Sequence, residues 1–255
     1  TASTSVNGFT SSIRGAFSYV ESLDRSLTSI RIVTGDSREE MAKFAVEANN
    51  AAQALGRQTK EYTNAALTFY QQGLNDEQVR VRTEAVLKAQ NITNSGSEMA
   101  DYLTAVWNGF KVSAEDTVLY VDKLAAVADS SASDMSELAV AMSKVASTAN
   151  NMGVTIDQLT AQIATIVATT RVAPETVGNA LKTIYARIND IKAGTDDAEI
   201  SLGQYTGRMK SLGINVLDSN GRLRDTGDVM TEIGEKWSSM TREQQIYLAQ
   251  TMAGQ

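Results

Sequence analysis

The chain has 255 residues, 42% of them hydrophobic and 21% charged, so it is long and apolar enough to bury a core. It has no histidine and no cysteine, which excludes disulfides, thiolate metal sites and histidine-based catalysis. The net charge of −7 argues against nonspecific nucleic-acid binding. No apolar run reaches the roughly 20 residues that a membrane span needs.

Residues 8–33 are predicted to form one amphipathic helix that ends near Gly35. Its apolar residues recur at steps of three and four positions, and they are Ile13, Phe17, Val20, Leu23, Leu27 and Ile30. A heptad-like stripe of this kind is typical of a helix that packs against a partner helix. We call these six residues the N-terminal seam and expect them to contact copies of the chain or another partner protein.

Between residues 37 and 194 the sequence repeats one local pattern. A Ser, Thr or Asn precedes acidic or amide residues, and an apolar stripe of helical period follows. Capping boxes are predicted at Ser37, Ser113 and Thr155. Pro174 suits the first turn of a further helix, which should end at Gly194. Because the connections are short, neighbouring helices should be antiparallel, so we expect helical hairpins.

The helical pattern is interrupted near residues 211–225. Ile214, Val216 and Leu223 flank a polar stretch that contains Asn220-Gly221. Asn-Gly between short alternating runs is a strong hairpin signal, so we predict a small β-hairpin there. Two further helices are predicted at about 227–239 and 241–253 from their apolar period.

The predicted fold is therefore all-α, an array of antiparallel helical hairpins with one small β-hairpin. It divides into an N-terminal amphipathic helix (1–36), a helical-hairpin core (37–194) and a part with the β-hairpin and C-terminal helices (195–255). The chain starts without methionine and ends without a capping pattern, so we expect it to be a piece of a longer protein.

Neighbouring carboxylates are the residues that come nearest to a chemical motif. Three pairs could in principle serve acid–base chemistry, namely Glu39-Glu40, Glu115-Asp116 and Asp196-Asp197. Each pair lies near a predicted helix start, where negative charge is favourable beside the helix dipole, so we interpret all three as structural.

Other motifs also have a structural interpretation. The stretch Asp218–Gly221 resembles a calcium loop, but its fifth position is Arg222, so we predict a turn. Arg80-Val81-Arg82 is interpreted as a solvated helix face. Five methionines are interpreted as core residues: Met41, Met99, Met135, Met142 and Met152. The sequence therefore predicts no catalytic residue, no metal, no cofactor and no specific nucleic-acid site.

Several stretches resemble the conserved helical region of phage tail tape measure proteins. The most specific are Phe69-Tyr70-Gln71-Gln72-Gly73 and Gly178-Asn179-Ala180-Leu181-Lys182-Thr183. Residues 27–40, 212–214 and 218–224, with Trp237, add to the resemblance, which covers roughly residues 23–253. At Arg57-Gln58 the chain departs from the family, which more often has small apolar residues there.

The resemblance implies a structural virion protein and not an enzyme. Such proteins occupy the lumen of the growing tail, their length sets tail length, and they are released during genome delivery. The implied partners are copies of the chain itself, the tail tube protein, tail assembly chaperones and tail tip or baseplate proteins. The implied location is the phage tail, and the host cytoplasm during assembly.

Taken without the resemblance, the residues leave two alternatives open, a cellular helical scaffold or a segment of a peptidoglycan-cleaving enzyme. A molecular ruler should also be extended, whereas this chain is full of helix stops such as Gly56 and Gly73. We therefore expect the folded, non-ruler part of a tape measure protein, or a part that switches between folded and extended forms.

Overall fold

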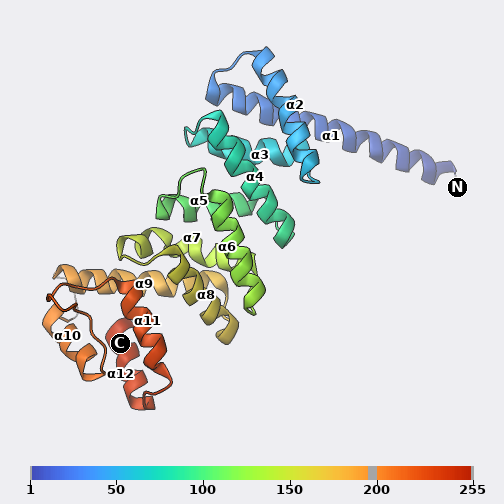
Figure 1. Ribbon diagram of the computed structural model, residues 1–255. Coiled ribbons are helices and arrows are strands. Elements are labelled where there is room, and N and C mark those ends of the chain that lie inside the picture. The colour runs from blue at the N-terminus through green and yellow to red at the C-terminus, as the bar shows by residue number, and fades with distance from the viewer. Residues whose placement is uncertain (1, 195–199, 254–255) are drawn as a thin grey trace. The chain divides into compact units, whose positions relative to one another are not determined.

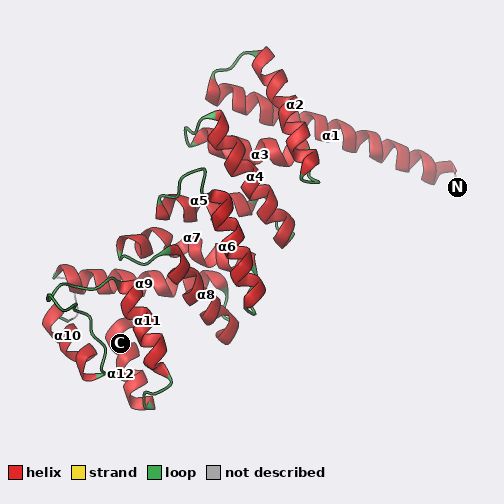
Figure 2. Ribbon diagram, viewed as in Figure 1, coloured by secondary structure: helices red, strands yellow, loops and turns green. Residues whose placement is uncertain are grey.

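The computed structural model describes residues 2–194 and 200–253, with side chains from Arg14 onward. These residues form twelve α-helices and no sheet, and 77% of the chain is helical (Figures 1 and 2). The predicted all-α class is therefore confirmed. Contacts group the chain into two compact units, Thr1–Asp101 with Ser113–Val121 and Tyr102–Val112 with Asp122–Gln255.

The first unit is built around one helix. Its helices are α1 (Ala2–Thr34), α2 (Arg38–Ala54), α3 (Thr59–Gln71) and α4 (Asp76–Thr93), with the first turns of α5 (Glu98–Phe110) and α6 (Thr117–Ser130). Helix α3 has extensive contacts with α1, α2 and α4. Tyr62, Ala66 and Phe69 of α3 are buried. The core of this unit is therefore the apolar surface of α3 and the helix faces that cover it.

Side-chain caps determine where several helices begin. Ser37 accepts the Glu40 N–H at 3.2 Å, and the Glu40 carboxylate accepts the Ser37 N–H at 2.8 Å, which confirms the first capping box. The box at Thr155 is confirmed in the same way. Helix α6 instead begins at Thr117, later than a box at Ser113 predicts. The Ser113 hydroxyl donates to the Asp116 carboxylate at 2.8 Å, and this bond holds the residues before α6 in a turn.

The second unit is centred on two closely packed helices. Its helices after α6 are α7 (Met135–Asn151), α8 (Ile156–Thr170), α9 (Pro174–Ala193), α10 (Leu202–Ser211), α11 (Thr226–Trp237) and α12 (Arg242–Ala253). The most extensive contacts in the unit join α7 to α9. A Cβ placed on Gly178 of α9 would lie 2.3 Å from the Ala141 carbonyl oxygen of α7. The two backbones therefore approach each other more closely than any larger residue at position 178 would permit.

Methionine contributes to the cores of both units, as the sequence predicts. Each of the five methionines interpreted as core residues is at most 7% exposed. Trp107, Tyr185 and Tyr205 are the largest fully buried side chains of the described residues. The flexible methionine side chain suits the spaces between helices that carry few aromatic residues.

The β-hairpin predicted near residues 211–225 is wrong, because the structure contains only a single antiparallel bridge there, between Leu217 and Leu223. The type I′ hairpin turn that Asn-Gly favours needs a positive φ at both central residues, whereas only Gly221 has one, at +76°. The Asp218 carboxylate instead accepts the N–H groups of Asn220 and Arg222, both at 2.8 Å, and so forms a wider turn.

Side-chain hydrogen bonds also prevent further strand pairing beyond this bridge. The Asn215 carbonyl accepts a hydrogen bond from the Arg224 guanidinium, and the Asn215 N–H donates to Glu232 of α11. These backbone groups are therefore unavailable for pairing between strands. The segment packs on α11 as a turn, with Ile214 and Val216 buried.

Candidate functional site

The N-terminal seam changes from buried to exposed along α1. Ile30 is fully buried, Leu23 and Leu27 are partly exposed, and Val20 and Phe17 are 62% and 75% exposed. The side chain of Ile13 lies outside the described residues. Residues at steps of three and four share one face of a helix, so the exposed and buried members belong to one stripe. The C-terminal end of the seam therefore packs inside the first unit, whereas Val20 and Phe17 remain exposed.

Packing within the first unit explains this change. Helix α1 has its most extensive contacts with α3, and Ser26 is buried as well as Ile30. In Figure 1 the N-terminal part of α1 extends past α2 and α3. An exposed Phe and an exposed Val one turn apart form an apolar surface that a partner helix could cover.

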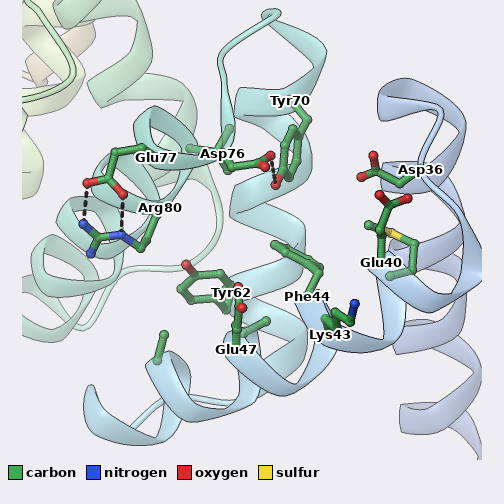
Figure 3. A pocket seen from close by; sticks show the side chains of 14 residues that line it. Asp36, Glu40, Lys43, Phe44, Glu47, Tyr62, Tyr70, Asp76, Glu77 and Arg80 are labelled. Carbon is green, nitrogen blue, oxygen red and sulfur yellow. Dashed lines mark hydrogen bonds and ion pairs between the residues drawn. The ribbon is translucent and has the colours of Figure 1, made fainter.

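A second candidate site is a concave surface that we call the α2–α4 cleft. It lies between α2 and the first turn of α4, with α3 as its floor, and its volume is about 380 Å³ (Figure 3). Helices α2 and α4 both pack on α3. The cleft therefore follows from two helices that use the same central helix as their support.

Three aromatic rings line the cleft. Phe44 of α2 lies between Tyr62 and Tyr70 of α3, with ring centroids 6.5 Å and 5.9 Å apart (Figure 3). The Tyr70 hydroxyl donates to the Asp76 carboxylate at 3.0 Å. Edge-on and tilted ring pairs of this kind are favourable, so the three rings hold one another in place.

Burial makes both phenols harder to ionise. It raises the pKa of Tyr62 to about 12, and the negative charges of Glu84 and Glu47 add to that effect. Burial also raises the pKa of Tyr70 far above its ordinary value, and the Asp76 carboxylate raises it further. At neutral pH the two residues therefore offer rings and hydroxyl groups, and they do not act as bases.

The rim of the cleft is acidic. Carboxylates line both walls, with Asp36, Glu40 and Glu47 on the α2 side and Asp76 and Glu77 on the α4 side. The positive charges that line the cleft are those of Lys43 and Arg80.

Several rim charges already have a partner. Arg80 pairs with Glu77 at 2.6 Å and with Glu84 at 3.0 Å, both on α4. Glu40 belongs to the capping box, and hydrogen bonds from the backbone and side chain of Ser37 lower its pKa. Lys43 lies 3.3 Å from Glu39, which is outside the cleft.

The other sequence-predicted sites are not gathered in this cleft. Glu39 is exposed beside Lys43, Glu115 and Asp116 are exposed, and Asp196-Asp197 lies outside the described residues. Asp218–Gly221 forms the predicted turn. No group of three or more potential metal-ligating side chains lies close enough to hold a metal ion within residues 2–194 and 200–253. None of the helices described is long and apolar enough to cross a membrane.

The interpretation of Arg80-Val81-Arg82 as a solvated face is wrong for Arg82. Arg80 is exposed, but Arg82 is only 6% exposed, and its guanidinium carbon lies 6.0 Å from the centre of the Phe69 ring. Burial lowers the pKa of Arg82, although the charge of Glu115 opposes this effect. Arg82 therefore belongs to the core of the first unit.

Sequence reasoning did not identify the cleft. By their spacing, Phe44, Tyr62 and Tyr70 are only apolar positions on two successive helices. A signal was present, because four aromatics, Phe69 included, fall within 27 positions of a chain in which aromatics make up 6%. What the sequence could not show is that the space between α2 and α4 leaves Phe44 half-buried beside two buried tyrosines.

The chain matches a known family over most of its length. The model of a family described as phage-related minor tail protein matches residues 47–254. This range contains the C-terminal half of α2 and all the described helices from α3 to α12, but not α1. No match to the chain was found among the solved structures.

Proposed function

Because the chain belongs to the family of phage-related minor tail proteins, we propose that it is the folded part of a tape measure protein. Membership of this family implies a structural role in the phage tail and a location in the virion. The finer assignment, a role in tail length determination and genome delivery, is our proposal. It is carried by the family match over residues 47–254, and the resemblance of residues 69–73 and 178–183 to tape measure proteins supports it.

The folded form is the second element of the proposal. Drawn out as one helix, 255 residues would span about 380 Å, at 1.5 Å per residue. Six of the described helices instead end at a glycine with positive φ, namely Gly35, Gly56, Gly73, Gly153, Gly194 and Gly213. We infer that another part of the parent protein serves as the ruler, and that this part attaches it to its neighbours in the tail.

The partners follow from this role. We propose that the exposed end of the N-terminal seam joins copies of the chain. Further contacts would be with the tail tube protein, tail assembly chaperones and tail tip or baseplate proteins. Before incorporation into the tail, the protein would be in the host cytoplasm, where assembly takes place.

The test is tail length in phage with an altered parent gene. Inserting 20 helical residues outside residues 1–255 should lengthen the tail by about 30 Å, at 1.5 Å per residue. Duplicating residues 37–194 should lengthen it by far less than an extended helix of the same number of residues would. Electron microscopy of purified tails measures both changes. Tails of unchanged length after the first insertion would refute the tape measure assignment.

A further inference from the structure

The described ion pairs leave part of the acidic rim without a cationic partner. Arg80 is held by Glu77 and Glu84 on its own helix, and Lys43 pairs with Glu39. Among the residues whose side chains the structure describes, no ion pair engages Asp36, Glu47 or Asp76. These three carboxylates lie on both walls of the cleft, so a group between the walls would face negative charge on two sides (Figure 3).

The aromatic floor provides an independent reason to expect a cation. Aromatic rings carry negative charge on their faces, and cations bind over them, arginine most often among protein side chains. Phe44 is only half-buried, and it lies at the centre of the ring cluster formed with Tyr62 and Tyr70. A guanidinium is planar, so it can stack on a ring and donate to a carboxylate at the same time.

Nearby carboxylates act on both tyrosines of the cleft. The charges of Glu47 and Glu84 raise the pKa of Tyr62 in addition to burial, and those of Asp76 and Asp36 raise the pKa of Tyr70. Arg80 opposes the effect of the carboxylates at Tyr62. Carboxylates of the rim therefore act on the floor of the cleft as well as on its walls.

We propose that the α2–α4 cleft binds arginine side chains of a basic segment in a partner protein. A volume of about 380 Å³ is within the range of sites that enclose a small ligand, and it suits one or two side chains. The carboxylates of the two walls select the charge, and the half-buried ring of Phe44 selects a planar group. This inference does not depend on the tape measure assignment, because it rests on the cleft alone.

Calorimetry of the full chain with an octa-arginine peptide tests the proposal. The wild-type chain should bind the peptide saturably, and binding should weaken as salt increases. The cleft variant, Asp36→Asn with Glu47→Gln, should bind at least about fivefold more weakly, because both changes remove an attractive charge at the site. Glu47 is exposed and Asp36 is half-buried, so both amides can be accommodated, and a thermal melt checks the fold.

Two further variants distinguish a site from general attraction to an acidic chain. Asp129→Asn with Glu235→Gln changes the net charge equally in the second unit, and its affinity should stay close to wild type. Phe44→Leu keeps an apolar side chain but removes the ring, and should weaken binding about two- to fivefold. Equal loss in the control and the cleft variant, unchanged affinity in Phe44→Leu, or absence of saturable binding would each overturn the proposal.

Discussion

Gly178 shows how a single atom can determine the packing of two helices. Glycine inside a helix usually costs about 0.5–1 kcal/mol relative to alanine, so its place in the middle of α9 needs a reason. The reason is the Ala141 carbonyl oxygen of α7, which would lie 2.3 Å from a Cβ at this position. A backbone carbonyl cannot rotate away as a flexible side chain can, so the helices themselves would have to separate.

We therefore expect Gly178→Ala to lower the free energy of unfolding by about 1–3 kcal/mol, the usual cost of overpacking a core. Urea denaturation followed by circular dichroism measures the change. The matched control is Gly207→Ala in α10, where an added Cβ would have no heavy atom within 4 Å. That change should be neutral or should stabilise the chain by up to about 1 kcal/mol. Equal stability of the two variants would contradict the close approach of α7 and α9.

Glu232 connects the turn between α10 and α11 to α11 through its hydrogen bonds. It accepts hydrogen bonds from Arg224, from Lys236 at 2.8 Å and from the Asn215 N–H. Burial alone would raise the pKa of Glu232, but the bonds from Lys236 and Arg224 outweigh burial and lower it below 4.5. A carboxyl with a lowered pKa stabilises the fold above its unfolded pKa, and that contribution is lost as the pH falls through the folded value.

Glu232→Gln should therefore destabilise the chain by about 1–3 kcal/mol at neutral pH, because it leaves two cations without their shared carboxylate. The difference from wild type should shrink as the pH falls below 4.5. Urea denaturation at several pH values measures both effects, with the exposed Glu235→Gln on the same helix as control. A difference that is independent of pH would show that the ion pairs do not produce it.

At the scale of elements, α1 combines two roles along one stripe. Ile30 packs into the first unit, whereas Phe17 and Val20 are exposed. Replacing both exposed residues with glutamate should leave the thermal stability unchanged, because neither side chain is buried in the fold. If the exposed seam joins copies of the chain, the same change should weaken self-association at least about tenfold, since burying one such side chain contributes about 1.5–3 kcal/mol.

Sedimentation velocity over a range of concentrations measures this association. The matched control is Ser18→Glu with Ile32→Glu, which adds the same charge to exposed positions of α1 on a different face. Its association should resemble that of the wild type. A wild-type chain that stays monomeric at every concentration, or a seam variant that associates equally well, would refute the self-association proposal.

The elements themselves were largely predictable because their signals are local. The boxes at Ser37 and Thr155 place helix starts from four residues each, and helical period supplies the rest. The prediction of a β-hairpin was wrong because the conformation of this segment depends on tertiary contacts. Asn220-Gly221 is a hairpin signal only if the flanking backbone can pair, and Arg224 and Glu232 occupy the backbone groups of Asn215 instead.

At the scale of the whole molecule, the predictable part ends where distant residues meet. The sequence favours packing between consecutive helices, yet α1 packs on α3 and α7 packs on α9. The interior glycine at position 178 was the available signal for such a crossing, but it does not identify the partner helix. The cleft could not be predicted for the same reason, because its walls are two helices that both pack on α3. The predicted division at residues 36 and 194 stays a prediction.

Lys123 and Asp157 offer a direct test of whether this chain stays folded in an assembled tail. The Lys123 amine lies 2.9 Å from both carboxylate oxygens of Asp157, although the residues are 34 positions apart. In one extended helix they would be about 50 Å apart. A zero-length carbodiimide should therefore join them both in the isolated chain and in purified virions. The Lys43–Glu39 pair, which lies within one helix, should be joined whether the chain is folded or extended, and so controls for reagent access. Loss of the Lys123–Asp157 product in virions, with Lys43–Glu39 retained, would mean that this segment unfolds and serves as part of the ruler.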